Sequence, residues 1–336
     1  MVIPGTGSLV GKAPPSLAAI HAPVRGRLDA VTAEIRRIVV SDFPLVEEVN
    51  EYLLLMRGKM FRPTLLLLTN EVGDRRSDHA VTLAAVVELV HMATLVHDDA
   101  VDHSVLRRGL PTVNALWSHQ MAIIMGDYLY SRSVSELAKV GNLEAVVVMA
   151  DAANEMSMGE MRQLTSHDAL DFSEEDYYRL IASKTASLMA AACELGALVG
   201  AEENRAAMAS FGHNLGMAFQ IADDLLDYTG SEHVTGKPSG HDLRERKVTL
   251  PLVGALEHAS RDELSQIRRF FTLVDPSDDD ILRIVEIVGE RGGLDYAHAR
   301  AMEFAERAEE SLESVGDGAP VEALREAVAY AVARRR

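Results

Sequence analysis

The stretch of sequence that decides the fold is "DHAVTLAAVVELVHMATLVHDDAVDH", residues 78–103. It is apolar on nearly every face of a helix and ends in a cluster of aspartates. A helix of this kind is either buried in a protein core or spans a membrane. The apolar run from Val81 to Val96 covers 16 residues and is interrupted by Glu88 and His91, whereas a bilayer span needs about 20 predominantly apolar residues. We therefore predict a buried central helix.

Helical periodicity on both sides of this segment predicts an all-α protein. Aromatic residues make up only 5% of the chain and its 11 prolines are sparse, which favours helices over strands. Residues 230–247 are rich in glycine and charge and are predicted to form a loop or lid. Residues 1–23 are expected to be a flexible tail, and residues 24–336 a single all-α domain. The predicted helices cover residues 24–40, 44–56, 62–73, 78–103, 112–140, 142–166, 174–199, 202–229, 248–258, 261–272, 278–290, 293–315 and 319–334.

The overall charge and the cysteine count exclude some classes of protein. The formal net charge of −18 argues against a nucleic-acid partner, because nonspecific binding to nucleic acid needs a basic surface. An anionic ligand would have to be held by local basic side chains or by metal ions. The single cysteine, Cys193, excludes an internal disulfide and fits a reducing cytoplasm, where we expect the protein to be.

Two aspartate clusters share the spacing DDxxD. The first ends the central helix, and the second lies in "FQIADDLLDY", residues 219–228. Residues four apart on a helix project from one face, so Asp98 with Asp102, and Asp223 with Asp227, can each chelate a cation. Carboxylate oxygens suit Mg²⁺, which also binds substrate phosphates. A solvated helix face would explain one such cluster. Two clusters that each follow an apolar helix indicate a cleft, where carboxylates repel one another unless cations neutralise them.

Basic residues accompany these clusters. Each of them alone would be explained as an ordinary surface charge. Together with the paired aspartate clusters they indicate two anionic sites beside a metal site, since lysine and arginine side chains suit phosphate oxygens. The residues concerned are Lys59, Arg62, Arg107, Arg108, Lys184 with its neighbour Thr185, Lys237 and Lys247.

In their order along the chain, these motifs resemble those of the trans-isoprenyl diphosphate synthases, the polyprenyl synthetase family. The matching stretches are "RGKMFRP", "ELVHMATLVHDDAVDHSVLRRGLPT", "GDYL", "SKTASL", "FQIADDLLDY", "GKPSGHDL" and "KVTLP", within residues 57–251. The resemblance implies the isoprenoid synthase fold, in which helices surround a deep central cavity and the two aspartate motifs face each other at its mouth. It also implies dependence on Mg²⁺ and a homodimer.

The resemblance assigns roles by position. It implies an isopentenyl diphosphate site at Lys59, Arg62, His91 and Arg108, and an allylic diphosphate site at Arg107, Lys184, Thr185, Gln220 and Lys237, with Lys247 as a further substrate-binding residue. It implies that the direct magnesium ligands are Asp98, Asp102 and Asp223. It implies that the residues supporting these ligands are Asp99, Asp224 and Asp227. The implied catalytic set is these six aspartates with Arg107, Lys184 and Lys237. A lone histidine on an apolar helix is usually structural, and we interpret His97 and His103 so. His91 lies seven residues before Asp98, almost on the same helical face, which favours a functional role.

The implied reaction joins isopentenyl diphosphate to an allylic diphosphate. The allylic diphosphate departs and leaves a carbocation, the double bond of isopentenyl diphosphate attacks that cation, and a proton is then lost. Metal ions and basic side chains would stabilise the departing anion. The lid at residues 230–247 would exclude water, which would quench the cation.

Product length is expected to depend on the residues before the first aspartate cluster. Short-chain members of the family carry a bulky aromatic residue near the position of Ala93, whereas this chain has Ala93 followed by Thr94. The resemblance is therefore to long-chain members, with products of C30 or longer. In one departure from the family pattern, Arg246 stands where glycine is common, which puts the flexibility of the lid and the fit of the allylic substrate in question.

Other functions remain open from the sequence. The most serious is a short-chain synthase that makes a farnesyl or geranylgeranyl diphosphate. A noncatalytic subunit of a heteromeric synthase usually lacks one aspartate motif, and both are intact here. A terpene cyclase has a different second metal motif, and a lipid carrier would leave the second cluster unexplained. A long-chain product would need a membrane or a carrier to leave the enzyme, so peripheral membrane contact is an open expectation.

Overall fold

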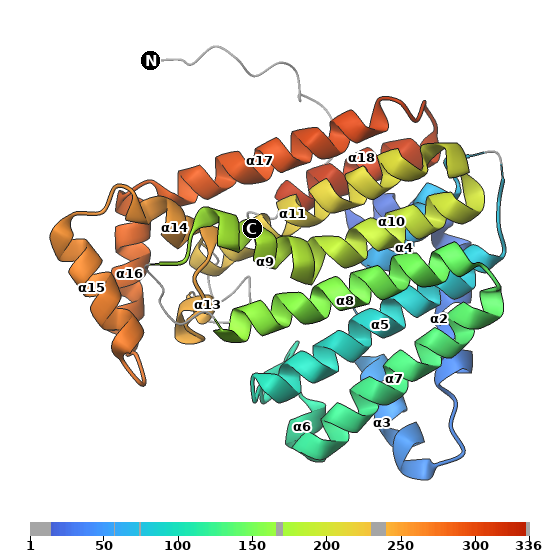
Figure 1. Ribbon diagram of the computed structural model, residues 1–336, viewed down its shortest axis with the longest axis horizontal. Helices are drawn as coiled ribbons and strands as arrows, with labels where there is room; N and C mark the ends of the chain where they lie inside the picture. Colours follow the sequence, from blue (N-terminus) through green and yellow to red (C-terminus); the bar gives the residue numbers. More distant parts are fainter. Residues whose placement is uncertain (1–14, 57, 74, 166–170, 230–239, 334–336) are drawn as a thin grey trace.

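The computed structural model describes residues 15–56, 58–73, 75–165, 171–229 and 240–333 (Figure 1). These residues are mostly helical, which confirms the all-α prediction. The helices before residue 170 are α2 (Arg25–Val39), α3 (Pro44–Leu55), α4 (Phe61–Asn70), α5 (His79–Val101), α7 (His119–Val140) and α8 (Leu143–Thr165). Those after it are α9 (Glu174–Ile181), α10 (Ser187–Gly200), α11 (Arg205–Thr229), α13 (His241–Arg244), α14 (Leu250–Leu256), α15 (Arg261–Thr272), α16 (Asp278–Glu290), α17 (Gly293–Leu312) and α18 (Ala319–Val332).

The helix α5 occupies the centre of the bundle, as predicted. It packs against α2, α4, α7 and α10, and every residue from Leu83 to Val90 is buried. By length and composition α5 could cross a membrane, but 67% of its most apolar stretch is buried inside the protein. Other helices cover it because each of its faces is apolar, so that no face could be left to water without cost.

The helices α4 and α10 approach each other closely. A Cβ atom added to Gly196 of α10 would lie only 2.1 Å from Thr69 Oγ1 and 2.2 Å from the Leu66 carbonyl oxygen of α4. Glycine is therefore required for these two backbones to pack at this distance. This contact supports α5 from one side, because both helices also pack against α5.

The predicted flexible tail is too long. Residues Leu17–His21 form the short helix α1 and Ala22–Val24 a 3₁₀ turn, so the prediction is wrong for residues 17–23. The reason is that Ile20 and Val24 lie one turn apart and are both buried, with α1 packed against α18. Two apolar positions are too few to reveal a helix by periodicity, and the partner helix lies about 300 residues away in sequence.

A short hairpin follows α5 where the sequence analysis predicted no strand. Its strands are β1 (Leu106–Arg107) and β2 (Leu110–Pro111), with Arg107 paired to Leu110. The turn residues Arg108 and Gly109 have φ values of +52° and +78°, as a tight two-residue hairpin turn requires. Strands of two residues have too little alternation to be predicted. After the hairpin, the single helix predicted over 112–140 is divided into α6 (Val113–Leu116) and α7.

The helix predicted over residues 174–199 is interrupted. Between α9 and α10 the backbone forms a π turn over Ala182–Ala186. Such turns widen a helix locally and are frequent at functional sites. Similarly, the helix predicted over 202–229 begins with a 3₁₀ turn, Glu202–Asn204, before α11.

One end of the molecule carries an additional pair of helices, α15 and α16, seen at the left of Figure 1. Their residues Ile267, Phe270, Ile281 and Ile284 form a separate small hydrophobic cluster together with residues of α11, α13 and α14. The last turns of α5 and α11, which hold the two aspartate clusters, lie toward this same end of the bundle (Figure 1). The described part of the predicted lid, residues 240–247, also lies there.

Candidate active site

The second half of α5 and the residue that follows it line parts of three cavities. The first cavity, of about 620 Å³, includes Asp102 at the end of α5. The second, of about 370 Å³, is lined by Ala93 and Thr94. The third, of about 470 Å³, is lined by Glu88 and His91. One helix therefore contributes side chains to all three cavities.

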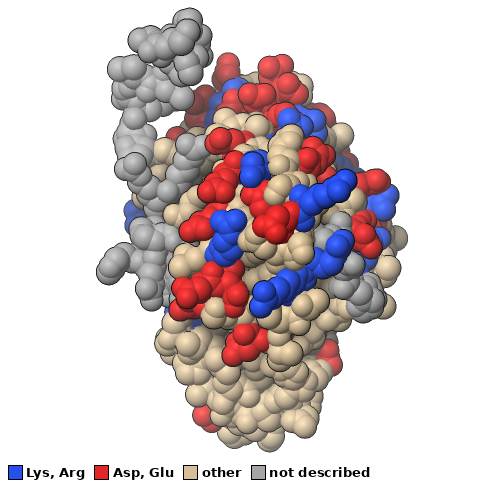
Figure 2. Space-filling model, turned by 90° about the vertical axis from the view of Figure 1, so that its left-hand side faces the viewer, with Lys and Arg blue, Asp and Glu red and all other residues tan. Residues whose placement is uncertain are grey.

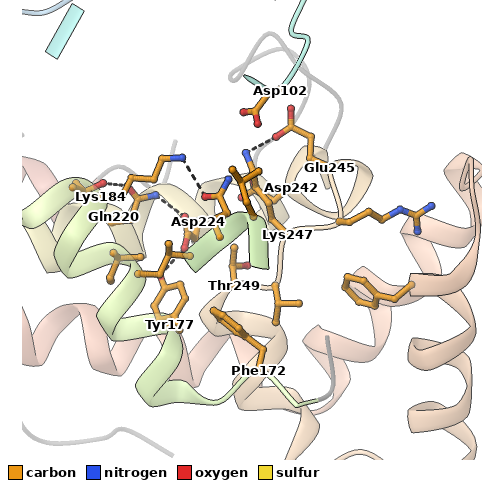
Figure 3. A pocket seen from close by; sticks show the side chains of 18 residues that line it. Asp102, Phe172, Tyr177, Lys184, Gln220, Asp224, Asp242, Glu245, Lys247 and Thr249 are labelled. Atoms are coloured by element: carbon orange, nitrogen blue, oxygen red, sulfur yellow. Dashed lines mark hydrogen bonds and ion pairs between the residues drawn. The ribbon is translucent and has the colours of Figure 1, made fainter. Parts of the chain in front are cut away.

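The first cavity gathers most of the predicted allylic site (Figure 3). Polar side chains line one part of it and apolar side chains, among them Phe172 and Val248, line another. A cavity of this kind can hold a charged group and an apolar group at once. The predicted residues that line it are Asp102, Lys184, Thr185, Gln220, Asp224 and Lys247.

A chain of hydrogen bonds holds Asp224 in place. Tyr177 OH donates to Asp224 Oδ2 at 2.5 Å, and Gln220 Nε2 donates to Asp224 Oδ1 at 2.8 Å. Thr185 in the π turn donates in turn to Gln220 Oε1 at 2.7 Å. Burial raises the pKa of the Asp224 carboxyl well above its ordinary value, and repulsion from Asp242 adds to this. The π turn is thereby tied to the second aspartate cluster on α11.

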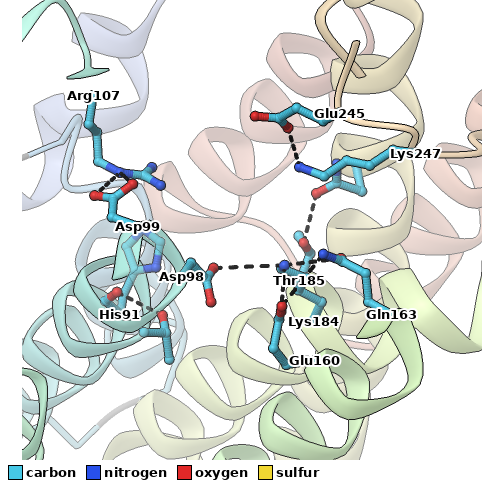
Figure 4. Close-up of polar contacts among 12 residues, drawn as sticks. His91, Asp98, Asp99, Arg107, Glu160, Gln163, Lys184, Thr185, Glu245 and Lys247 are labelled. Atoms are coloured by element: carbon cyan, nitrogen blue, oxygen red, sulfur yellow. Dashed lines mark hydrogen bonds and ion pairs between the residues drawn. The ribbon is translucent and has the colours of Figure 1, made fainter. Parts of the chain in front are cut away.

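Lys184, in the middle of the π turn, points to acidic and amide side chains (Figure 4). Its Nζ donates to Glu160 Oε2 at 2.6 Å and to Gln163 Oε1 at 3.1 Å, and it lies 3.8 Å from Asp98 Oδ2. Glu160 and Gln163 belong to α8. The ammonium group thus joins the first aspartate cluster to α8.

The third cavity gathers all four residues predicted for isopentenyl diphosphate. These residues are Lys59, Arg62, His91 and Arg108. Burial lowers the pKa of the His91 imidazole well below its ordinary value, and the charges of Arg62 and Arg108 lower it further. His91 is therefore neutral at physiological pH and can offer one N–H donor. Such a cluster of cations with one neutral donor suits a diphosphate.

The hairpin turn separates two adjacent arginines. Arg107 Nε donates to both carboxylate oxygens of Asp99, at 2.9 and 2.8 Å. Arg108 instead donates to the Met56 carbonyl at 2.6 Å and lies in the third cavity. Arg107 is the last residue of β1, whereas Arg108 lies in the turn at positive φ. The change of backbone direction between them lets the two side chains reach different partners.

Burial disfavours the ionised form of two aspartates in the first cluster. It raises the pKa of Asp98 to about 6, an effect that Lys184 partly offsets, and it also raises the pKa of Asp102. The ionised carboxylates are therefore poorly solvated here, and a bound cation would stabilise them in place of water. Within the part of the chain that the structure describes, no three acidic, histidine or cysteine side chains are arranged to hold a cation on their own.

The second cavity lies between α5, α7 and α8. Val90, Ala93, Met156 and Ala153 form apolar parts of its wall, and Thr94 and His97 add polar groups. His97 Nε2 lies 3.2 Å from the Ile123 carbonyl oxygen and 3.3 Å from Asp127 Oδ1. His97 thus has a structural contact between α5 and α7, in line with its interpretation.

Not every predicted site residue lines these cavities. Asp98, Asp99, Arg107, Asp223 and Asp227 do not, although Asp98 and Arg107 are linked to the site as described above. Asp227 accepts hydrogen bonds from the backbone N–H groups of His241 and Asp242, at 3.1 and 3.0 Å. Lys237 lies outside the described residues. His103, interpreted as structural, stacks on the ring of His119.

Several residues of the site were missed by sequence reasoning. Glu160 and Gln163 belong to α8 and Tyr177 to α9. None of the three lies in a stretch that resembles a motif of the family, so the sequence did not mark them. Asp242 lay within the quoted stretch "GKPSGHDL" and could have been found there. Tyr330, whose hydroxyl accepts from Lys59 Nζ at 3.0 Å, comes from the last helix.

Comparisons with known proteins identify the family of the chain. The model of the polyprenyl synthetase family matches residues 43–288. The all-trans-nonaprenyl-diphosphate synthase (geranyl-diphosphate specific) of Rhodobacter capsulatus is 37% identical, over 91% of this chain and 94% of that protein. Component 2 of the heptaprenyl diphosphate synthase of Geobacillus stearothermophilus is 36% identical, over 92% of this chain and 95% of that protein.

A solved structure shares the whole fold. The polyprenyl synthase of Caulobacter crescentus, complexed with calcium and isoprenyl diphosphate, superposes with a TM-score of 0.91 at 33% identity, over 97% of this chain and 100% of that one. Fold and cavities thus define a prenyltransferase of the all-α isoprenoid synthase class. The chain belongs to the polyprenyl synthetase family. Since the relatives it matches are named prenyl diphosphate synthases, it is an enzyme of that kind.

Proposed function

We propose that the protein is a Mg²⁺-dependent trans-prenyltransferase that condenses isopentenyl diphosphate with an allylic diphosphate and makes a polyprenyl diphosphate of C30 or longer. The observation that carries this proposal is the arrangement of the three cavities on α5. Two of them hold basic side chains suited to diphosphates. The other is lined by Ala93 and lies between α5, α7 and α8.

The metal fits the residues present. Asp98 and Asp102 lie one turn apart, and burial raises the pKa of both carboxyls, so a hard cation would stabilise their ionised forms. These two residues and Asp223 would hold Mg²⁺, together with oxygens of the substrate diphosphate. When bound, the metal would supply Lewis-acid stabilisation of the departing diphosphate. The solved relative from Caulobacter crescentus contains calcium and isoprenyl diphosphate, which supports a divalent cation beside an isoprenoid diphosphate.

The protein's own residues bind and orient the two substrates. Lys184 and Lys247 would hold the allylic diphosphate in the first cavity, where Gln220 and Thr185 orient it. Arg62, Arg108 and Lys59 would hold isopentenyl diphosphate in the third cavity, with neutral His91 as a further donor. Because both diphosphates are held, the double bond and the allylic carbon can be brought together. The proton that is lost would pass to the departed diphosphate.

The second cavity would receive the growing isoprenoid chain. Ala93 is buried and small, so it leaves this cavity open toward α7 and α8. The relatives named nonaprenyl and heptaprenyl diphosphate synthase support a long product. A geranylgeranyl or farnesyl diphosphate is the alternative product.

A homodimer is part of the proposal. Large apolar side chains are exposed along the hairpin, α6 and α7, among them Leu106, Leu116, Ile123 and Ile124. Figure 2 shows that the lower part of this view is almost free of charged side chains, whereas the upper part mixes acidic and basic ones. Exposed apolar patches of this kind mark contact surfaces between proteins. We also propose a cytoplasmic location, with peripheral membrane contact during product release.

The test is an incubation of purified protein with Mg²⁺, labelled isopentenyl diphosphate and each allylic primer from C5 to C20, followed by chromatography of the dephosphorylated products. Products of C30 or longer, lost when Mg²⁺ is chelated and in the Asp102→Asn variant, are the expected result. A stop at C15 or C20 would contradict the long product only. No product with any primer would favour a subunit that needs a partner, as the name of the Geobacillus relative suggests for that protein.

A further inference from the structure

Arg246 has an unusual backbone for a residue with a side chain. Its φ of +63° lies in the left-handed region that favours glycine. The side chain forms several contacts with α15: Nη1 donates to the Phe270 carbonyl at 2.7 Å, Nη2 donates to the Leu273 carbonyl, and the guanidinium lies 5.4 Å from the centre of the Phe270 ring. Arg246 thereby donates to two carbonyl groups at the end of α15, where a helix leaves carbonyls without their usual partners four residues on. The Phe270 carbonyl also accepts from the Leu273 N–H at 3.1 Å.

These contacts fix one end of the segment 240–247. The other end is fixed to α11, because the Gly240 N–H donates to the Asp227 carbonyl at 2.9 Å and the Asp227 carboxylate accepts two further N–H groups. Within the segment, the Lys247 N–H donates to the Asp242 carbonyl at 2.8 Å. The segment is therefore held at both ends.

The residue that follows Arg246 belongs to the site. Lys247 lines the first cavity, and its Nζ donates to Glu245 Oε2 at 2.6 Å. The position of this ammonium group depends on the backbone conformation of Arg246. Without the contacts of its side chain, Arg246 would not be held at a positive φ. The contacts of Arg246 with α15 therefore determine where Lys247 lies in the cavity.

We propose that Arg246 is a positioning residue, which holds Lys247 in the allylic diphosphate site by anchoring the segment 240–247 to α15. This inference rests on the function proposed above. Arg246 also lines the first cavity, but both of its terminal nitrogens donate to carbonyls of α15. A direct contact with substrate would require these bonds to break, so Arg246 acts through Lys247. The third cavity receives nothing from this segment, so its ligand is unaffected.

Two variants separate the backbone from the side chain. Arg246→Ala loses the anchor and keeps a residue that disfavours positive φ, whereas Arg246→Gly loses the anchor and accepts this backbone freely. Arg244→Ala is the matched control, because Arg244 makes a more exposed ion pair from the same segment to Asp278 of α16. The measurements are KM for farnesyl diphosphate, KM for isopentenyl diphosphate, and hydrogen exchange of the backbone amides of residues 243–248.

Both Arg246 variants are expected to raise KM for farnesyl diphosphate about tenfold, by misplacing a binding group, and to leave KM for isopentenyl diphosphate unchanged. Exchange at residues 243–248 should be faster in both, and the control should match the parent protein in all three measurements. An equal rise in both KM values, or a normal KM in the glycine variant, would overturn the proposal. If the parent protein makes no product with any primer, the proposed function fails. Hydrogen exchange at residues 243–248 then tests the anchor by itself. Exchange that is the same in the Arg246 variants as in the parent protein would overturn the anchor.

Discussion

At the scale of single residues, the site pairs its cations with carboxylates of the protein. Lys184 contacts Glu160, Lys247 contacts Glu245, and Arg107 contacts Asp99. A diphosphate must replace or join these carboxylates when it binds. The pairs hold the side chains in position, so less rotational freedom is lost on binding.

If the two cavities bind different diphosphates, two lysine variants should each affect a different substrate. Lys184→Ala should raise KM for the allylic diphosphate, and Lys59→Ala should raise KM for isopentenyl diphosphate. Each loses a charged hydrogen bond of about 1.5–3 kcal/mol, which corresponds to roughly 10- to 150-fold in kcat/KM for its own substrate. Steady-state kinetics with each substrate varied in turn measures both values. The assignment of the cavities is wrong if either variant affects both substrates equally.

The small side chain at position 93 predicts product length. Ala93→Phe should fill part of the second cavity and shorten the product, because the phenyl ring would occupy the space that the growing chain needs. Chromatography of the dephosphorylated products measures the change. Ala93→Ser, which adds one atom, is the control and should keep the parent length. If a folded Ala93→Phe variant makes a product of unchanged length, Ala93 does not limit the space for the growing isoprenoid chain.

Single residues could be predicted from sequence where a motif marked them. All four residues predicted for isopentenyl diphosphate line one cavity, although they are spread over 50 positions of the chain, because their types and order match the family. Glu160 and Tyr177 were missed because each contributes one side chain from an otherwise ordinary helix. Their role follows only from contacts across the bundle, which the sequence does not contain.

At the scale of elements, the periodicity of apolar residues was sufficient for the long helices and insufficient for the short interruptions. α5, α8 and α17 were predicted within a few residues of their ends, since each buries a long apolar stripe. The hairpin after α5 and the π turn before α10 extend over a few residues each, too short for a period to appear. These interruptions orient Arg107, Arg108 and Lys184, so the geometry of the site was the least predictable part.

The burial of Asp242 in the segment 240–247 predicts that part of the folding stability is lost as the pH rises. Burial and repulsion from Asp227 raise the pKa of Asp242 to about 6. The folded protein therefore binds a proton more tightly than the unfolded chain, and this contribution to stability is present at low pH and is lost as the pH rises through about 6. Without metal, Asp242→Asn should raise stability at pH 8 by about 1–3 kcal/mol and have little effect at pH 4.

Chemical denaturation in the presence of a chelator measures this difference. Asp275→Asn is the matched control, because Asp275 is exposed to solvent, and it should change stability at neither pH. An Asp242→Asn variant that is no more stable than the parent at pH 8 would show that the carboxylate is ionised there without cost.

At the scale of the whole molecule, the distribution of charge predicts a contact surface. Ile124 on α7 is 60% exposed and belongs to the exposed apolar side chains of the hairpin, α6 and α7. Sedimentation of the parent protein should give a dimer, and Ile124→Glu should give a monomer, because a charge cannot be buried in an apolar interface without a partner. The folding stability of the monomer should change by no more than about 0.5 kcal/mol, as for other exposed positions.

Val274→Glu is the control for this experiment. Val274 is fully exposed in the turn between α15 and α16, away from α7, so its substitution should leave the dimer intact. A dimer that survives Ile124→Glu would place the interface elsewhere on the molecule.

The burial of α5 on all sides also has a consequence for synthesis on the ribosome. The helix is complete at Val101, whereas α10, one of the helices that cover it, is complete only at Gly200, about a hundred residues later. At about 5–20 residues per second, translation leaves this apolar segment without its full cover for roughly 5 to 20 seconds. During that interval the nascent chain presents a segment apolar enough to be mistaken for a membrane anchor, so its yield in cells should depend on chaperones that shield it.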